Sequence, residues 1–389
     1  MKHNVCVISG SRAEYGLLKN LLHHLNSSKE INYQLICTGS HLSGRSGNTI
    51  QEINDDGFRI NASVKILSNS SSALDTCKAT SNCLKKISKE LLKLKPKMVI
   101  LLGDRFEIFA SAVAATILNI PIGHIHGGET TQGAIDEAFR HSITKMSYLH
   151  FVAADDYKKR VIQLGESKNR VFNVGGMGID AIRNLKTFSK EYLEGEYTFI
   201  KNSKYLMITY HPETLDEDSQ LDKLEKLLMS LDTFKDVKFI FTSSNLDTGG
   251  DEVNKRINSY VKNNNNAFFY KSLGQKLYFS LMKYSSGVVG NSSSGLLEAP
   301  YFNIGTVNIG ERQKGRIMSS SVINVKANKS AIKRALKVIL FEDNKSSIRS
   351  DSRKYPFGLG GASKRIVKIL ERELSKNNPI NLKKKFFDL

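Results

Sequence analysis

Residues 98–129, MVILLGDRFEIFASAVAATILNIPIGHIHGGE, contain the stretch that decides the fold. Residues 98–102 form a short apolar run that ends in Gly103, and residues 120–125 form a second one. Both runs predict buried strands, and residues 106–118 between them predict a helix. A strand, a helix and a strand in this order form a βαβ unit, whose two strands are parallel. The stretch therefore predicts a parallel sheet covered by helices on both faces.

The same alternation continues on both sides of this unit. Further strands are predicted at 4–9, 33–38, 150–154 and 171–174, and further helices at 13–25, 74–94 and 135–146. A second series follows, with strands at 205–209, 237–242, 267–270, 287–290 and 306–309 and helices at 221–231, 252–261 and 275–282. We therefore predict an α/β protein with two parallel-sheet domains of the Rossmann-like type.

Residues 188–203 separate the two series, because they are polar and charged and have no strong period. We place an N-terminal domain at 1–185, a second domain at 186–362, and a C-terminal helix (about 363–376) with a basic tail at 363–389. A chain of 389 residues is long enough for two cores. Such sheets bind ligands at the carboxyl ends of their strands, so we expect the site in the cleft between the domains.

The composition excludes several classes of protein. With 40% hydrophobic residues the chain has ample core material, which excludes a disordered protein and a disulfide-stapled miniprotein. The net charge of +19 suggests an anionic partner, but residues 310–389 carry 20 Lys and Arg against 7 Asp and Glu. We interpret this excess as helix surface and tail, and expect no binding of nucleic acid or membrane.

The four cysteines show no metal-ligand spacing, so we expect no structural zinc and no other metal site. No apolar run approaches the roughly 18 residues of a membrane span. The first apolar segment is too short for a signal peptide. These features predict a reduced, cytoplasmic protein.

Residues 10–16, GSRAEYG, form the first candidate cluster, between the first strand and the first helix. Glycine allows a tight turn, the helix start offers free N–H groups, and Arg12 adds a positive charge, so the segment suits an anion. The spacing differs from GxGxxG, which excludes the dinucleotide fingerprint. An ordinary turn between strand and helix is the alternative interpretation.

Asp104 and Arg105 form the second cluster, directly after the strand at 98–102. A carboxylate and a guanidinium at a strand end would both face the cleft. Asp104 could instead simply cap the following helix.

The third cluster is the densest in titratable groups and comprises His124, His126, Glu129, Asp136, Glu137, Arg140 and His141. If the strand continues to His126, then His124 and His126 lie on the same side of it. Asp136 and Arg140 are one helical turn apart. Imidazoles, carboxylates and an arginine together suit proton transfer, with Arg140 as a substrate contact. No HxxxH or HExxH metal spacing occurs, and a structural polar network is the alternative.

The fourth cluster belongs to the second domain and combines His211 with the turn Asn291–Ser294. A turn of serines between a strand and a helix presents hydroxyl and N–H groups together, which suits a diphosphate. Glu298, four to six residues into that helix, could accept hydrogen bonds from ribose hydroxyls. A solvated turn is the alternative for the serines.

Seven motifs occur in one order between about residues 5 and 316: GSRAEYGLL, LGDRFE, HIHGGE, AIDEAFRHSITKMSYLH, HPET, GNSSSGLLE and IGERQKGR. Together they resemble the hydrolysing UDP-N-acetylglucosamine 2-epimerases of bacterial sialic acid biosynthesis. The resemblance implies a glycosyltransferase-B-like fold whose final helix crosses back to the first domain. It also implies a homo-oligomer, dimeric or tetrameric.

The reaction that the resemblance implies converts UDP-N-acetylglucosamine and water to N-acetylmannosamine and UDP. Anti elimination of UDP, with loss of the C2 proton, gives 2-acetamidoglucal, and water then adds at C1 while C2 is reprotonated from the opposite face. No hydride moves, so no cofactor is expected. The motif positions imply catalytic roles for Asp104, Asp136 and His211 and substrate contacts for Arg12, Arg105, Asn245, Ser292, Ser293, Glu298 and Arg312.

Two positions depart from the family pattern. Many members read HIEGGE, with a catalytic Glu where this chain has His126. The acid/base role therefore passes either to His126 or to the nearby Glu129, and imidazole can perform it at neutral pH. Gly16 replaces a serine that contacts phosphate in some relatives.

The identity of the sugar is a second open question. Some relatives act on a 2,4-diacetamido-2,4,6-trideoxy sugar nucleotide of the legionaminic acid pathway. The HIHGGE variant is more similar to the sialic acid type, which favours UDP-N-acetylglucosamine. A non-hydrolysing 2-epimerase, a glycosyltransferase of the same fold and a non-catalytic polyanion-binding protein are the alternative functions.

Overall fold

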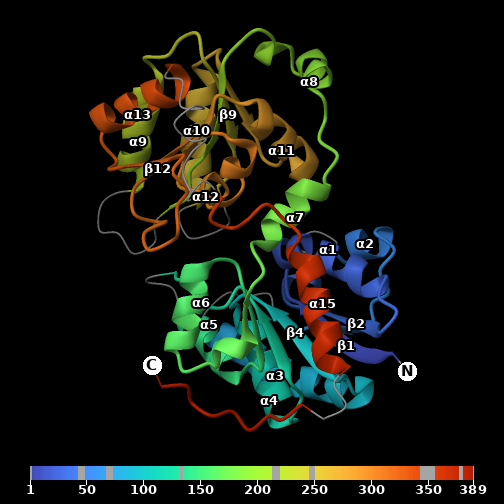
Figure 1. The fold of residues 1–389 in the computed structure, drawn as a ribbon. Helices are drawn as coiled ribbons and strands as arrows, with labels where there is room; N and C mark the ends of the chain where they lie inside the picture. Colours follow the sequence, from blue (N-terminus) through green and yellow to red (C-terminus); the bar gives the residue numbers. More distant parts are fainter. Residues whose placement is uncertain are drawn as a thin grey trace. The chain divides into compact units, whose positions relative to one another are not determined.

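The computed structural model describes residues 2–42, 49–66, 73–131, 135–212, 220–244, 250–341, 355–375 and 380–388 (Figure 1). The chain divides into two compact units. Unit 1 comprises Met1–Ala181 and Phe357–Leu389, and unit 2 comprises Ile182–Pro356. The boundaries predicted at 185/186 and 362/363 lie four and six residues from these divisions.

Unit 1 contains a parallel sheet of seven described strands in the order β3-β2-β1-β4-β5-β6-β7. The strands are β1 (His3–Ser9), β2 (Ile31–Thr38), β3 (Ala62–Val64), β4 (Met98–Leu102), β5 (Ile122–Ile125), β6 (Leu149–Val152) and β7 (Val171–Asn173). The helices are α1 (Arg12–Asn26), α2 (Thr49–Asp55), α3 (Ala73–Leu94), α4 (Phe106–Ile117), α5 (Asp136–Met146), α6 (Asp155–Gln163), α7 (Met177–Asn184) and α15 (Ala362–Leu374). The division between the units falls within α7.

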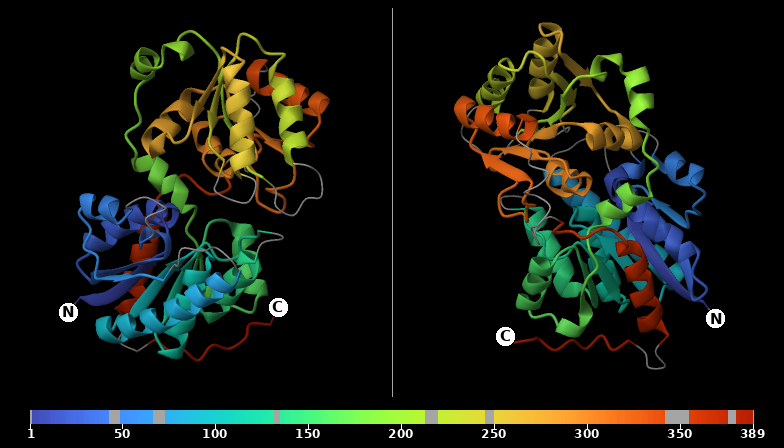
Figure 2. Two further views of the ribbon diagram at one scale, coloured as in Figure 1. Left: turned by 180° about the vertical axis from the view of Figure 1, so that it is seen from behind. Right: turned by 45° about the horizontal axis from the view of Figure 1, so that its top comes forward.

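Helices cover both faces of this sheet, as the buried strands predict (Figures 1 and 2). Val5 and Val7 of β1 pack in one core with α1 and α15, whereas Cys6 and Ile8 pack in another with α3 and α4. The alternation follows from the two-residue period of a strand. The strands of this sheet also bury a few polar side chains, among them His124 of β5 and His150 of β6.

Unit 2 repeats the arrangement with six described parallel strands in the order β10-β9-β8-β11-β12-β13. They are β8 (Tyr205–Thr209), β9 (Lys238–Thr242), β10 (Ala267–Tyr270), β11 (Gly287–Gly290), β12 (Thr306–Ile309) and β13 (Val322–Val325). The helices are α8 (Lys190–Glu196), α9 (Gln220–Leu231), α10 (Gly250–Lys262), α11 (Gly274–Tyr284), α12 (Ser294–Leu297) and α13 (Lys329–Phe341). Helices α9, α10 and α13 share a core with one face of the sheet.

The order of six strands in unit 2 is that of a Rossmann fold, and unit 1 follows the same order with one more strand. The prediction of two Rossmann-like parallel-sheet domains is therefore confirmed. The predicted cleft location of the site stays a prediction. In the described ranges, no helix combines the length and the apolar character that a membrane crossing requires.

Helix α15 returns to unit 1 from the far end of the sequence and packs against α1. Its first turn is capped by Asp180, which accepts hydrogen bonds from the N–H groups of Gly361, Ala362 (3.1 Å) and Ser363 (2.6 Å). A carboxylate at a helix N-terminus satisfies donors that the helix leaves unpaired. Leu18 of α1 and Ile366 of α15 lie in the same buried core.

In the C-terminal tail, residues 380–388, Lys384 makes the largest set of polar contacts with the rest of unit 1, and the Phe387 N–H adds a hydrogen bond to the Gly165 carbonyl (3.0 Å). Lys384 Nζ lies 2.8 Å from both carboxylate oxygens of Glu166 and donates to the carbonyls of Lys145 (2.7 Å) and Ser147 (2.8 Å). Burial raises the pKa of Glu166, but hydrogen bonds from His150, Lys145 and Lys384 outweigh it and lower the pKa to about 2. The basic tail is thus partly an internal structural element.

We expect the Lys384→Ala substitution to destabilise unit 1 by about 2 kcal/mol, because it removes charged hydrogen bonds from a buried carboxylate. This loss corresponds to a fall of about 4–8 °C in the Tm of the unit 1 transition. Differential scanning calorimetry measures it. Lys385→Ala is the matched control, since Lys385 is exposed, and we expect it to shift Tm by less than about 2 °C. Equal shifts for the two variants would contradict the role of Lys384.

Candidate active site

The order of strands reverses between β1 and β4 in unit 1 and between β8 and β11 in unit 2. In open α/β sheets, ligands bind at the carboxyl ends of the strands at such a switch point. The sequence-predicted residues follow these ends: Arg12 after β1, Asp104 and Arg105 after β4, His126 after β5, His211 after β8, and Ser292 and Ser293 after β11. Each unit therefore brings its own predicted residues to its own switch point.

Arg140 organises the polar cluster at the ends of β4 and β5. It is only 5% exposed, and it forms an ion pair with Asp104 and another with Glu137. It also donates to the carbonyl of Glu129 (3.1 Å) and to the hydroxyl of Thr131 (2.9 Å). Protein acceptors thus surround a side chain that the sequence suggested as a substrate contact. The burial of Arg140 favours a role in which Arg140 positions Asp104 and Glu129.

His126 and Glu129, the two candidates for the missing family Glu, contact each other. His126 Nδ1 lies 3.1 Å from Glu129 Oε1, and the Met177 N–H points at His126 Nε2 at 3.4 Å. Since a backbone N–H can only donate, Nε2 accepts, and Nδ1 carries the proton that is donated to Glu129. His126 also has φ of +66°, a left-handed backbone that is rare for residues other than glycine and concentrates at functional sites.

Asp136 is the first residue of α5 and is half-buried. Burial raises its pKa, and the positive charge of Arg105 offsets part of this increase. A carboxylate whose pKa is raised toward neutrality is suited to accept and return a proton. Asp136 and Arg105, predicted from separate motifs, therefore influence each other at one end of the sheet.

Arg12 lies at the start of α1, where it pairs with Glu52 at 3.0 Å. Its side chain is largely exposed. Ser11 caps the helix by accepting the N–H of Glu14, as the turn after β1 predicts. Arg12 is thus available at the surface of unit 1.

The alternation suggested that His124 and His126 lie on the same side of one strand, but only His124 is part of the strand. Strand β5 ends at Ile125, and His126 turns into the left-handed region. His124 is fully buried and contacts the carbonyl of Gly103 (2.9 Å) and the hydroxyl of Thr144 (3.1 Å). Burial lowers its pKa to about 3, so His124 is a neutral core residue that supports the turn before Asp104.

Asn291 belongs to the predicted turn but was given no role of its own, and the structure shows that it joins the two strand ends in unit 2. Its side chain accepts the His211 N–H (2.7 Å) and donates to the His211 carbonyl (2.8 Å). Its own carbonyl accepts from Arg312 (3.2 Å) and Gln313 (2.7 Å). Asn291 is completely buried, and its place in the GNSSSG motif directly after a strand is the signal for this structural role. It fixes the backbone on which His211 stands.

The serine turn after β11 forms a small hydroxyl cluster. Ser292 Oγ lies 3.1 Å from Ser294 Oγ, which lies 2.7 Å from the hydroxyl of Tyr278. Ser293 is the residue before α12 and is partly exposed. The turn thus presents hydroxyl groups at the carboxyl end of β11, beside His211.

Glu298 was predicted four to six residues into a helix, but α12 spans only Ser294–Leu297 and Glu298 is its C-terminal cap. The chain continues as a 3₁₀ turn that begins at Ala299, because Pro300 cannot extend the α-helix. Burial raises the pKa of Glu298 to about 7, and its Oε2 is buried without a hydrogen-bond partner in the described part of the chain. A hydroxyl donor from a ligand would satisfy this atom.

Asn245, which the resemblance places in the cleft, lies outside the described residues. Among the described residues, no group of three or more His, Cys, Asp or Glu side chains is arranged to hold a metal ion. We therefore build the candidate site from the remaining predicted residues and Asn291.

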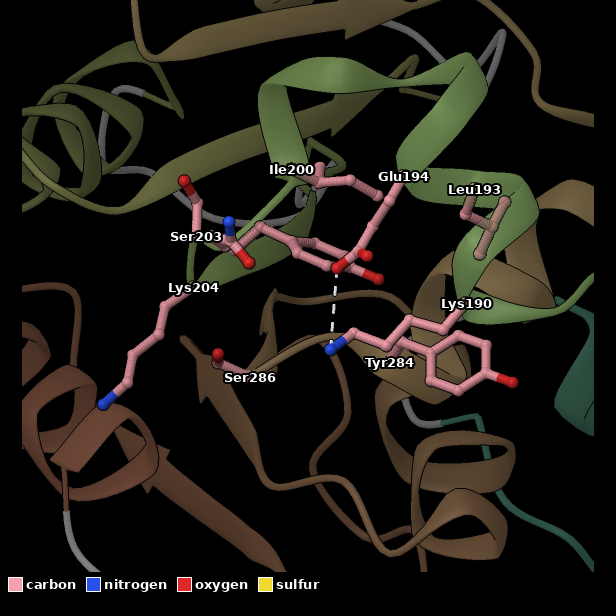
Figure 3. Close-up of a pocket in the computed structure, with 10 residues that line it drawn as sticks. Lys190, Leu193, Glu194, Ile200, Ser203, Lys204, Tyr284 and Ser286 are labelled. Atoms are coloured by element: carbon pink, nitrogen blue, oxygen red, sulfur yellow. Dashed lines mark ion pairs between the residues drawn. The ribbon is translucent and has the colours of Figure 1, made fainter.

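A cavity of about 270 Å³ lies elsewhere in unit 2 (Figure 3). Its walls include Tyr205, the first residue of β8, and Ser286, which precedes β11. Lys190 and Glu194 of α8 form an ion pair of 3.5 Å across it (Figure 3). The cavity thus lies at the amino ends of the strands, opposite the end that carries His211 and the serine turn.

Two Rossmann-like sheets in one chain define an α/β protein of the glycosyltransferase-B-like class. The solved structure of UDP-GlcNAc 2-epimerase from Neisseria meningitidis bound to UDP-GlcNAc has the same fold, with a TM-score of 0.80. It is 22% identical, and the match covers 95% of this chain and 100% of that one.

The chain belongs to the UDP-N-acetylglucosamine 2-epimerase family, whose model matches residues 23–371. It is 40% identical to the GDP/UDP-N,N'-diacetylbacillosamine 2-epimerase (hydrolyzing) of Campylobacter jejuni, over 84% of this chain and 85% of that protein. It is 41% identical to the polysialic acid biosynthesis protein P7 of Escherichia coli, over 90% of each. The resemblance stated from the motifs is therefore confirmed at the level of the family.

Proposed function

We propose that this protein is a hydrolysing 2-epimerase that converts UDP-N-acetylglucosamine and water to N-acetylmannosamine and UDP. The observation that carries the proposal is the set of carboxylates at the ends of β4 and β5. Arg140 binds Asp104 and the backbone of Glu129, and Asp136 begins the helix that carries Arg140. An elimination followed by hydration needs such groups, because a proton leaves C2 and another returns to it.

We assign proton transfer at C2 to Asp136 together with Glu129. The raised pKa of Asp136 supports this role, since a base with a pKa nearer the working pH transfers protons more effectively. We assign to Asp104 a contact with the sugar or with a transferred proton, because Arg140 holds it rigidly. No step moves a hydride, so the proposal includes no cofactor.

We assign the nucleotide to unit 2. Ser292, Ser293 and His211 would contact the diphosphate, and the unpaired Oε2 of Glu298 would accept a ribose hydroxyl. Arg312 donates to the Asn291 carbonyl, so it stands beside the same turn. Arg12 and Arg105 of unit 1 would stabilise the negative charge that develops as UDP leaves.

A second candidate substrate is UDP-2,4-diacetamido-2,4,6-trideoxyglucose, with the same reaction. The similarity to the Campylobacter jejuni protein, whose name specifies N,N'-diacetylbacillosamine, favours it. The similarity to the polysialic acid protein of Escherichia coli favours N-acetylglucosamine. The two sugars differ at C4 and C6, so a direct comparison of rates decides between them.

The test is mass spectrometry of the products from each UDP-sugar in heavy water. We expect free N-acetylmannosamine with one deuterium at C2 and an equal amount of UDP, and a kcat/KM at least about tenfold higher for UDP-N-acetylglucosamine. A faster reaction of the diacetamido sugar would assign the second substrate. An intact mixture of nucleotide sugars would indicate a non-hydrolysing epimerase. No turnover without an acceptor would indicate a glycosyltransferase.

A further inference from the structure

Two carboxyl groups are buried beneath the ends of β1 and β4, where an anion is proposed to bind. Glu14 lies in the first turn of α1 and is 6% exposed, and Glu107 lies in the first turn of α4 and is fully buried. Both belong to motifs that the sequence singled out, yet the proposed reaction uses neither. Negative charge near a proposed diphosphate site needs a specific reason, because it opposes the binding of an anion.

The two carboxyl groups have different partners. Glu107 Oε1 accepts the Arg105 Nε–H at 2.7 Å, whereas Glu14 Oε2 accepts the Gly10 N–H at 2.7 Å. Glu14 Oε1 is 4.0 Å from Arg105 Nε, beyond hydrogen-bonding distance. Glu107 is therefore the carboxylate that binds Arg105, and Glu14 serves the turn after β1.

The surrounding glycines provide the space for Glu107. A Cβ atom at Gly10 would lie 2.6 Å from both Cγ and Oε1 of Glu107, and one at Gly39 would lie 2.9 Å from Oε1. Gly39 also has φ of +60°, which favours glycine. The turn after β1 is thus shaped to receive a carboxylate from α4.

The contact with Glu107 fixes the guanidinium of Arg105 and leaves its fork available. Only Nε donates to Glu107, and in the described residues the two terminal nitrogens of Arg105 form no hydrogen bond. The side chain is 47% exposed, so the fork reaches solvent. Two parallel N–H groups match the oxygens of a phosphate, and holding them in place lowers the entropy lost on binding.

The local charge remains favourable for an anion. Burial, followed by repulsion from Glu107, raises the pKa of Glu14 to about 8. Glu14 is therefore mainly uncharged at neutral pH. The carboxylate of Glu107 is then paired with the guanidinium of Arg105. Asp136 is a further charged group near Arg105.

We propose that Glu107 is the positioning residue of Arg105, which it orients through Nε so that the terminal nitrogens grip the diphosphate of the substrate. The inference rests on the proposed function, because it needs a UDP-sugar as the ligand. Glu107 itself would touch neither the substrate nor the reacting atoms.

A double-mutant cycle on UDP affinity, measured by calorimetry with the full chain, tests this inference. We expect Glu107→Gln to weaken UDP binding about tenfold and Arg105→Ala to weaken it by about tenfold to a hundredfold. Glu107→Gln should add less than a twofold effect in the Arg105→Ala background, because it acts only through Arg105. A purely structural role would lower affinity equally in both backgrounds, and that result would overturn the inference.

Glu14→Gln is the matched control. It also converts a buried carboxyl to an amide, and it keeps an oxygen for the Gly10 N–H, so we expect UDP affinity within twofold of the native protein. Equal losses for Glu14→Gln and Glu107→Gln would contradict the assignment to Glu107.

Arg105→Lys covers the case in which Glu107→Gln does not fold. It keeps the charge but not the fork, and we expect about tenfold weaker binding. Binding equal to the native protein would overturn the inference. Native protein that neither binds UDP nor turns over a UDP-sugar would refute the proposed function, and the role of Arg105 with it. If the native protein turns over a UDP-sugar, but Glu107→Gln lowers UDP affinity by the same factor with and without Arg105→Ala, only the positioning role of Glu107 is refuted.

Discussion

Asp136→Asn is expected to lower kcat by about 10³-fold while UDP affinity changes by less than about threefold. An amide has nearly the shape of a carboxylate but cannot accept the C2 proton. Asp136 begins α5, a position that tolerates Asn, so the fold should persist. Steady-state kinetics with UDP-N-acetylglucosamine and calorimetric UDP titration measure the two effects separately.

Asp155→Asn is the matched control for this substitution. Asp155 is the first residue of α6, as Asp136 is of α5, and it is exposed. Any effect of losing negative charge at a helix N-terminus is therefore common to both variants. We expect native kcat for Asp155→Asn. Substantial activity of Asp136→Asn would remove Asp136 from the acid/base set.

The pH profile adds a second measurement on Asp136. Burial raises its pKa, so the carboxyl stays protonated up to a higher pH than an ordinary aspartate. A protonated carboxyl cannot act as a base, and kcat/KM should therefore fall as pH drops through this raised pKa. An acidic limb at or below the usual aspartate range near 3.8 would contradict this assignment.

The central strands could be predicted from sequence because they are buried on both faces. Strand β4 spans the same residues as its apolar run, Met98–Leu102, and so does β8, Tyr205–Thr209. Of the four edge strands, β7 and β10 were predicted, whereas β3 and β13 were not, because they are only partly buried and carry no continuous apolar run. A strand that is buried on both faces has a continuous apolar run, which is the clearest strand signal in a sequence, and β3 and β13 lack such a run.

Residues 188–203 show a similar limit. They were interpreted as a polar segment without a period, but they contain α8, which Ser189 caps by accepting the Tyr192 N–H. Only Leu193 of this helix is buried. A helix that buries one side chain leaves almost no hydrophobic periodicity to detect.

The sequence predicted which residues form the candidate site better than it predicted the contacts among them. Motif positions placed Asp104, His126 and Arg140 near one another, but only the structure shows that Arg140 is enclosed by Asp104, Glu137, Glu129 and Thr131. Helical spacing had suggested that Asp136 and Arg140 act together. A side chain as long as Arg140 can reach several partners from one helix position, and spacing alone does not select among them.

The second large effect concerns Glu129 and His126. We expect Glu129→Gln to lower kcat by about 10²- to 10³-fold, and His126→Asn by about tenfold. Both ring nitrogens of His126 are engaged, Nε2 by the Met177 N–H and Nδ1 by Glu129. We therefore propose that the imidazole orients the Glu129 carboxylate and that Glu129, three residues further along the chain, takes the role of the family Glu.

Comparing His126→Asn with His126→Ala separates the loss of the imidazole from the effect of backbone strain at position 126. His126 has φ of +66°, which Asn tolerates better than Ala does. We therefore expect His126→Ala to lose thermal stability that His126→Asn retains, while the two lose similar kcat. Single-turnover kinetics of the three variants with UDP-N-acetylglucosamine, together with their melting curves, measure both effects. If His126→Asn were inactive and Glu129→Gln active, the proton would pass through the imidazole, and the assignment of the two residues would be reversed.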